Sequence, residues 1–418
     1  MKKFKFTTKL LMGATIACAL ALSFTSCEDD DDEEPPAPPQ STGCSPVAPT
    51  LDVNLDITAD RTWSKDTVYI LRSRIKVRPG VTLTIQPGTV IKGDEGQGNA
   101  AVVLMVMRDA TLIADGTSAE PIIFTSINDC LEPGDIASPN LPTDAVGLWG
   151  GIAILGNAVI ASGDTDPNGG GFDYDQIEGV PSSDSDGQYG GNDNTDNSGI
   201  LRFVSVRHGG TQIGSGNELN GISFGGVGSG TIVENVEIVG NADDGLEFYG
   251  GAVNATNVVV WNNGDDALDT DQNYVGTISN AFIVGPAGSV VELDGPEGGA
   301  VATANHTIQN VTVAATRGGS TNAEDLLNFD ANTNITFQNV YYSVVNSAQK
   351  FNPNGVNCTS GVFSNLTLNV AAGTASTYIN AGEPDLTGAV SEGTTGQANA
   401  ADFANWSWAG VAGNLGSL

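Results

Sequence analysis

One pattern occurs three times in succession in the middle of the chain, as NELNGISFGGVGSG (217–230), NADDGLEFYGGAVN (241–254) and NNGDDALDTDQNYVG (262–276). Equivalent residues in these repeats are 24 and then 22 positions apart. A period in the twenties is typical of a solenoid, in which each repeat forms one coil of the chain. The repeats therefore predict a fold made of stacked coils.

The segments between and after the repeats are short runs in which β-branched residues alternate with other residues, at 231–240, 255–262, 276–285, 306–316 and 334–345. Such runs predict short β-strands, two or three to each coil. A leucine-rich repeat has a similar period, but its spaced leucines and its helical half are missing here. We therefore expect an all-β fold, a right-handed parallel β-helix.

Successive coils of a parallel β-helix lie about 4.8 Å apart, so equivalent residues form columns. The register of the repeats points Ile222, Leu246 and Leu268 into the core and leaves Glu247 and Asp269 on the outer face. The aspartate pairs 243–244 and 265–266 are aligned by the same register. Stacked carboxylates repel one another, so the column requires hydrogen bonds, splayed side chains or a cation.

The acidic column allows three interpretations. Asp and Asn side chains often bond the backbone of a turn, which would make the cluster structural. A calcium ion would instead take several of the oxygens as ligands. Paired carboxyl groups about 5 to 9.5 Å apart can also hydrolyse a glycosidic bond, and a polysaccharide lyase would need a basic residue as well. The catalytic candidates are Asp244, Asp266, Asp269, Arg202 and Arg207.

The chain contains 16 Lys and Arg residues against 49 Asp and Glu residues, a net charge of −33. Nucleic acid is therefore not expected as a partner, because phosphate binding requires a basic surface. Three cysteines follow residue 27, namely Cys44, Cys130 and Cys358. They allow one disulfide, and the sequence does not choose the pair.

The first 26 residues have the features of a secretory signal peptide, with four lysines, an apolar run over 10–22 and small residues before Cys27. The end of this segment resembles the lipobox of bacterial lipoproteins, which implies cleavage before Cys27 and lipidation of that cysteine. An ordinary signal peptide with an incidental cysteine is one alternative, and cleavage before Cys18 is another.

Residues 27–50 contain seven consecutive acids followed by a proline-rich stretch, EDDDDEEPPAPPQ (28–40). Repulsion between the acids and the stiffness of the prolines keep such a segment extended, so we expect a tether. It resembles the acidic signal that directs Bacteroidetes lipoproteins to the outer face of the outer membrane. A spacer on a periplasmic lipoprotein is the alternative. The expectation is a lipid-anchored outer-membrane protein exposed at the cell surface.

Residues 51–418 are expected to form a single β-helix domain. Two long polar segments, 128–147 and 161–199, interrupt the coils and are expected to be insertion loops, which often lie on a functional face. Near the C-terminus, FANWSWAGVAGNL (403–415) contains Trp406 and Trp408. We expect them to cap the open end of the helix, and a ligand-binding aromatic pair is the alternative.

The second insertion contains DTDPNGGGFDYD (164–175), which has the spacing of an EF-hand calcium loop. Asp164, Asp166, Asn168 and Asp175 occupy the first, third, fifth and twelfth positions, and a glycine occupies the sixth. The loop departs from the pattern at Gly171, at its final Asp in place of Glu, and in lacking flanking helices. The spacing allows two interpretations, a calcium site formed by these four residues and a loop that is merely rich in Gly and Asp.

Several segments resemble known β-helix proteins. VTLTIQPGTVIKG (81–93), ATLIADGTSAEPIIFTS (110–126) and GLWGGIAILGNAVI (147–160) resemble the opening coils of bacterial pectin-lyase-like β-helices. DNSGILRFVSVRHGG (196–210), together with the DDGLEFYGG repeats, resembles a group of Bacteroidetes surface β-helix proteins. This resemblance implies the fold, but the fold carries lyases, hydrolases, adhesins and inert stalks alike.

The resemblance to an enzyme is weaker. GDDALD (264–269) is similar to the Asp-Asp stretch of polygalacturonase-like hydrolases, but neither the Gly-His-Gly nor the Arg-x-Lys motif of that family follows it in the chain. We therefore expect a non-enzymatic function, in which a long rigid face binds a glycan, an extracellular matrix component or a surface protein, with calcium stabilising loops. A polysaccharide-degrading enzyme and a purely structural surface protein are the alternatives.

Overall fold

The computed structural model describes residues 44–163, 172–180, 184–211, 219–297, 304–316, 323–351, 360–380, 386–413 and 415–418. The chain divides into two compact units, 1–42 and 43–418, and all described residues belong to the second. The predicted signal peptide, Cys27 and most of the tether lie outside the described residues. Within the described ranges, no helix is long and apolar enough to cross a membrane.

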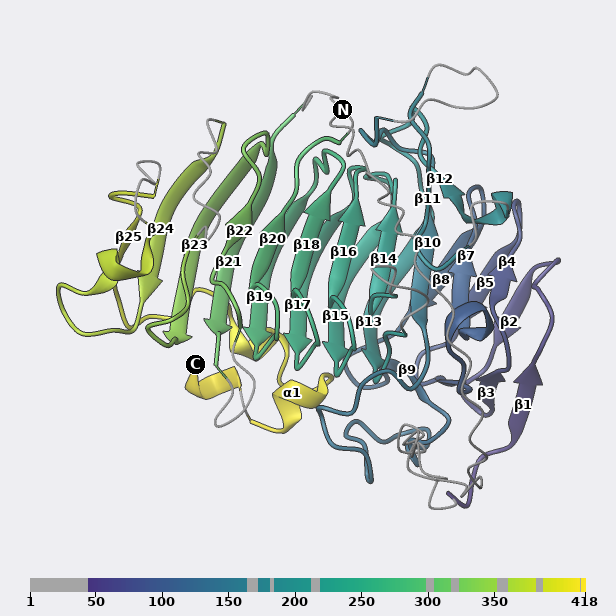
Figure 1. The fold of residues 1–418 in the computed structure, drawn as a ribbon. Helices are drawn as coiled ribbons and strands as arrows, with labels where there is room; N and C mark the ends of the chain where they lie inside the picture. The colour runs from purple at the N-terminus through teal and green to yellow at the C-terminus, as the bar shows by residue number, and fades with distance from the viewer. Residues whose placement is uncertain are drawn as a thin grey trace, which may run out of the picture. The chain divides into compact units, whose positions relative to one another are not determined.

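Two parallel sheets form the body of this unit and confirm the predicted all-β, right-handed parallel β-helix (Figure 1). The larger sheet has 15 strands: β1 (Thr50–Val53), β2 (Arg61–Trp63), β3 (Val68–Leu71), β5 (Thr82–Ile85), β6 (Val90–Gly93), β8 (Thr111–Asp115), β9 (Ile122–Ser126), β13 (Gly199–Arg207), β15 (Ile232–Val239), β17 (Asn254–Trp261), β19 (Thr277–Val284), β21 (His306–Ala314), β23 (Ile335–Val344), β24 (Val362–Leu368) and β25 (Val390–Glu392).

The smaller sheet has eight strands: β4 (Ile75–Val77), β7 (Val103–Val106), β10 (Gly151–Leu155), β14 (Ile222–Gly225), β16 (Leu246–Tyr249), β18 (Leu268–Asp271), β20 (Val291–Leu293) and β22 (Asn328–Phe329). Strands β11 (Asp175–Gln176) and β12 (Gln188–Tyr189) form a separate antiparallel pair in the second insertion. The helix α1 (Trp408–Val411) lies near the C-terminus.

The larger sheet bends, and this gives each coil three sides. The first half of β13 pairs with β8 and its second half pairs with β9, with Phe203 between them at φ 50°. Later coils place an asparagine at this bend, where φ is also positive, as at Asn235 and Asn257. Asparagine tolerates this left-handed conformation better than most residues. The Asn257 amide donates to Asn235 Oδ1 at 2.9 Å, so the bends are also bonded to one another.

The core consists of columns of inward-facing side chains. Ile222, Leu246 and Leu268 are paired in register and fully buried, as the repeats predicted. The rings of Phe224 and Phe248 stack with their centroids 5.0 Å apart. Removing each such side chain from water contributes about 1.5 to 3 kcal/mol to folding, so the columns hold the coils together.

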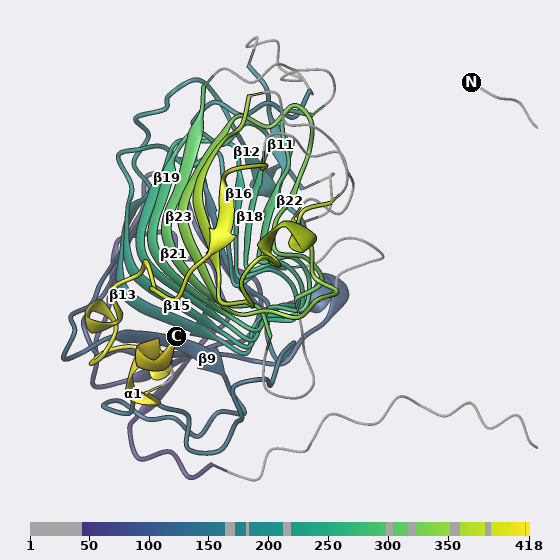
Figure 2. The ribbon, with the colours of Figure 1, turned by 90° about the vertical axis from the view of Figure 1, so that its left-hand side faces the viewer.

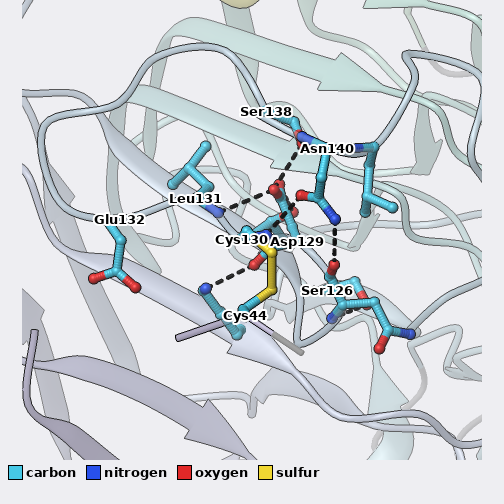
Figure 3. The surroundings of a disulfide bond; sticks show 12 residues. Cys44, Ser126, Asp129, Cys130, Leu131, Glu132, Ser138 and Asn140 are labelled. Carbon is cyan, nitrogen blue, oxygen red and sulfur yellow. Dashed lines mark hydrogen bonds between the residues drawn. A yellow bond between two sulfur atoms is a disulfide. The ribbon is translucent and has the colours of Figure 1, made fainter. Parts of the chain in front are cut away.

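A disulfide fixes the start of the domain to the first insertion (Figure 3). Cys44 is bonded to Cys130, whereas Cys358 lies outside the described residues. The neighbouring carboxylate of Asp129 organises this loop, because its Oδ1 accepts hydrogen bonds from the Ser138 hydroxyl at 2.7 Å and the Leu131 N–H at 3.1 Å. The pair that the sequence left open is therefore Cys44 with Cys130.

The C-terminal segment lies outside the coils, on the side of the larger sheet (Figures 1 and 2). The prediction that Trp406 and Trp408 cap the open end is therefore wrong. Both pack on an apolar patch of the outer face of the sheet that includes Val259 and Phe282. The segment is anchored by Glu237, which accepts the backbone N–H of Trp408 at 3.0 Å. Apolar residues on the outer face favour such a cover, because exposing them to water is costly.

Candidate functional site

The predicted acidic column lies on the outer face of the eight-stranded sheet. In-register pairing places Ser223, Glu247, Asp269 and Glu292 one above another on β14, β16, β18 and β20. Side chains at equivalent positions of neighbouring strands are close enough to interact. The predicted alignment of Glu247 with Asp269 is confirmed, and Glu292 extends the column by one coil.

A second column runs through the turns that precede these strands. It contains Asn220, Asp244, Asp266 and Ser289, each two residues before its strand begins. The N–H of Asp266 donates to Asp244 Oδ1 at 2.9 Å, and the N–H of Ser289 donates to Asp266 Oδ1. Each carboxylate thus accepts a hydrogen bond from a backbone N–H of a turn, as the structural interpretation expects. The N–H belongs to the turn of the next coil and not to the turn that contains the carboxylate.

Several of these carboxyl groups are removed from water. Asp244, Glu247 and Asp266 are 7%, 8% and 5% exposed. Burial raises the pKa of Asp244 and of Glu247 well above the ordinary value, and neighbouring carboxylates raise both further. Burial, followed by a hydrogen bond with Glu292, raises the pKa of Asp266 to about 10. In the absence of a cation, burial therefore favours the protonated form of these three groups.

The same oxygens are grouped closely enough to hold a metal ion. Carboxylate oxygens of Asp244, Glu247 and Asp269 all lie within 4.8 Å of one another, and so do those of Asp243, Asp244 and Asp265. Asp269 Oδ1 is buried and has no hydrogen-bond partner among the described residues. Calcium takes about six to eight oxygen ligands, so three facing carboxylates fit part of its ligand set.

The second insertion covers part of this sheet. Ile177 and Tyr189 of the insertion belong to an apolar cluster with Met105 and Leu155 of the sheet. The Tyr189 ring lies 5.8 Å from that of Tyr249, two residues beyond the acidic Glu247 position on β16. The insertion therefore packs on the outer face of this sheet beside the acidic column.

Of the four predicted calcium ligands in the EF-hand-like loop, the structure describes only Asp175. Asp175 begins β11, and its Oδ2 accepts a hydrogen bond from Gln272 Nε2 at 2.6 Å. Asp164, Asp166 and Asn168 lie outside the described residues. The calcium loop therefore stays a prediction.

The two arginines that were candidates for catalysis lie on the other sheet. Arg202 forms ion pairs with Asp115 at 2.7 Å and with Glu234 at 2.9 Å, both on neighbouring strands. Arg207 is fully buried and lies 3.6 Å from Glu237. The enzyme alternative would require one of these arginines to face Asp244 and Asp266, but both lie on β13, whose two halves form the other sides of the coil.

Sequence reasoning missed the asparagines that support the acids. The Asn220 amide donates to Glu247 Oε2, and the Asn263 amide donates to the carbonyl oxygens of Asp265 and Asp266 at 2.8 and 2.6 Å. The signal was present, since Asn220 occupies the repeat position of Asp266. Asn241 and Asn263 also stand two residues before each Asp-Asp pair, and Asn241 donates to the Asp244 carbonyl at 2.7 Å.

Comparison with protein families matches residues 55–410 to the family described as a pectate-lyase like beta helix domain. Comparisons with curated proteins and with solved structures found no match. The family match spans most of the chain, so the protein belongs to the pectate-lyase-like β-helix family.

Proposed function

From this family membership and the acidic column, we propose that the protein is a non-enzymatic surface protein that binds a glycan or a matrix partner and takes up calcium. It would be anchored in the outer membrane by a lipid on Cys27 and exposed at the cell surface, as in Bacteroidetes. The lipobox-like end of the signal segment and the acidic, proline-rich tether at 28–40 support this proposed location. Nucleic acid is not a proposed partner, because the net charge is −33.

The observation that carries the calcium proposal is the lack of compensating charge in the column. Asp244, Glu247 and Asp269 approach one another closely, yet none of them takes part in an ion pair within the described part of the chain. Buried like charges are costly unless they are protonated or share a cation. A divalent ion in this column would neutralise the carboxylates and stiffen the face between the turns and the insertion.

Hydrolysis of a glycan is the second candidate function, since a pair of carboxyl groups catalyses the reaction in glycosidases. That chemistry needs one protonated and one ionised carboxyl group at neutral pH. The pKa values of Asp244, Glu247 and Asp266 are all raised, which favours three protonated groups. A lyase would need a base, and Arg202 and Arg207 are held on the other sheet. The geometry therefore supports cation and partner binding better than catalysis.

Calcium binding is tested on the purified full-length protein by isothermal titration calorimetry. We expect Asp244→Asn and Glu247→Gln to weaken calcium binding at least about tenfold, because each removes a charged ligand. Asp115→Asn, a change of an acid on the larger sheet, is the matched control and should leave the affinity unchanged. Equal affinities in all four proteins would place calcium elsewhere.

Partner binding is tested by incubating the same protein with neutral and acidic polysaccharides, with and without calcium, and measuring both retention and new reducing ends. Retention without new reducing ends supports the proposal. Reducing ends that disappear in Asp266→Ala would show an enzyme. Failure to retain any of the polysaccharides would overturn glycan binding and favour a purely structural role.

A further inference from the structure

A separate pocket lies where the second insertion meets the turns that follow β4, β7 and β10. Its volume is about 340 Å³, and all of its lining residues are among those described. The turns contribute Arg108, Asp109 and Asn157, and the insertion contributes Tyr174, Asp186 and Gln188. The acidic column lies on later strands of the same sheet, near the N-terminal ends of β14, β16, β18 and β20 and in the turns before them. We call this hollow the Arg108–Tyr174 pocket.

The two named residues join the walls of the pocket. The Arg108 guanidinium lies 4.7 Å from the centre of the Tyr174 ring, and its Nη1 donates to the Gly190 carbonyl at 3.3 Å. A cation over an aromatic face is attractive, so this contact holds the insertion against the turns. A guanidinium has five N–H donors. No ion pair in the described part of the chain uses Arg108, which leaves donors for a ligand.

The other polar groups are held in place by neighbours. The Asn157 amide donates to Asp109 Oδ1 at 3.0 Å, which fixes the side chain and leaves its carbonyl oxygen as an acceptor. Asp186 is held by Lys76 at 2.6 Å and by Arg78 at 2.8 Å. The pocket therefore offers an aromatic ring beside planar donors and acceptors with fixed positions. A ligand that matches it has an apolar face surrounded by hydroxyl groups, as a sugar ring has.

Charge decides between sugar classes. The charges of the lining nearly cancel, because Arg108 is balanced by Asp109 and Asp186 is ion-paired with Lys76 and Arg78. The chain as a whole has a net charge of −33 and repels anions, so an acidic sugar is disfavoured. We infer that the Arg108–Tyr174 pocket binds a neutral saccharide unit. Tyr174 packs against the sugar, and Arg108, Asn157 and Gln188 form hydrogen bonds with its hydroxyl groups. This inference rests on the proposed glycan binding and gives it a site that is separate from the calcium column.

The test is calorimetric titration of the full-length protein with cellobiose, maltose and lactose, and with digalacturonate as the acidic comparison. We expect at least one neutral disaccharide to bind, and digalacturonate to bind at least about tenfold more weakly. Arg108→Ala and Tyr174→Ala should each weaken the neutral sugar about tenfold, because each removes a hydrogen-bonding or packing partner. Tyr174→Phe keeps the ring and should keep most of the affinity.

Two matched controls exclude a general effect of the substitutions. Arg61→Ala removes an exposed arginine of β2 that does not line the pocket, and Phe172→Ala removes an aromatic residue of the insertion that is 36% exposed. Both should bind like the unchanged protein. Unfolding midpoints of all variants establish that they are folded, so a loss of binding reports on the pocket.

The outcomes separate this inference from the broader proposal. Polysaccharide retention that persists in Arg108→Ala and Tyr174→Ala would overturn the pocket but leave glycan binding standing. Failure of every polysaccharide and disaccharide to bind the unchanged protein would overturn both. Tighter binding of digalacturonate than of the neutral disaccharides, lost in Arg108→Ala, would overturn the assignment to neutral sugars.

Discussion

The substitution Asp266→Asn tests whether the acidic column costs stability when no calcium is present. Asp266 is 5% exposed, its Oδ1 accepts the N–H of Ser289, and burial raises its pKa to about 10 from 3.8. A carboxyl group whose folded pKa is raised stabilises the folded state fully below the unfolded pKa. That contribution is lost as pH rises toward the folded pKa. The free energy of unfolding should therefore fall between pH 5 and pH 8.

The size of this fall follows from proton linkage. One pKa unit corresponds to about 1.36 kcal/mol, so three pH units between the two pKa values give an upper bound of about 4 kcal/mol for this group. Relaxation around a buried carboxylate reduces that bound, and we expect a loss of about 2 to 4 kcal/mol. Asparagine has nearly the same shape, accepts the same N–H bond and does not titrate. The variant should lose correspondingly less stability.

The measurement is urea unfolding at pH 5 and pH 8 in the presence of a calcium chelator. Asp266→Asn should be more stable than the unchanged protein at pH 8, and the two should differ little at low pH. Asp115→Asn, which alters an acid on the other sheet, should keep the full pH dependence. The reasoning is refuted if the unchanged protein is equally stable at both pH values, or if Asp266→Asn declines just as steeply.

Three further predictions concern the calcium site, the buried ion pair and the disulfide. Calcium at a hundred times its dissociation constant should raise the free energy of unfolding by about 2.7 kcal/mol, and thermal melts of Asp244→Asn at the same calcium concentration should show at most about half of this gain. Glu237→Gln leaves the buried Arg207 without its charged partner, so urea unfolding should show a loss of about 3 to 5 kcal/mol, and the double variant with Arg207→Met should recover much of it. A full effect of Glu237→Gln in the Arg207→Met background would contradict that pairing. Cys130→Ser should lower the free energy of unfolding by about 2 to 4 kcal/mol and should make melts insensitive to dithiothreitol, whereas melts of the unchanged protein should respond to it.

The repeats predicted the fold and the acidic column because both depend on local pattern. Alternation along each strand determines which residues face inward, and a repeat of fixed length then aligns equivalent residues of neighbouring coils. Leu246 with Leu268 and Glu247 with Asp269 follow from these two facts alone. The bend asparagines were equally visible, since residues such as Asn235, Asn257 and Asn280 interrupt each long run at the same point.

Contacts between distant segments could not be predicted in the same way. The apolar run Val258–Trp261 has no polar alternation, which indicates cover on both faces, but nothing local shows that the cover is the C-terminal segment. Arg207 likewise contacts residues that are distant in the sequence. Glu237 lies on the next coil, and the Trp408 ring, whose centre is 5.1 Å from the guanidinium, belongs to the C-terminal segment that returns to this sheet. The Arg108–Tyr174 pocket exists only because an insertion folds back on earlier turns.

The disulfide between Cys44 and Cys130 also determines how mechanical force would travel through the molecule. A pull on the chain from the N-terminal side reaches Cys44 before any strand of the domain. The covalent bond then carries the tension directly to Cys130, so the strands from β1 to β9 lie off the load path. If the N-terminus is tethered to a membrane and a partner is held by later coils, shear would not peel β1 from the sheet. The first coils would therefore keep their structure even though the force is applied at the end of the β-helix that they form.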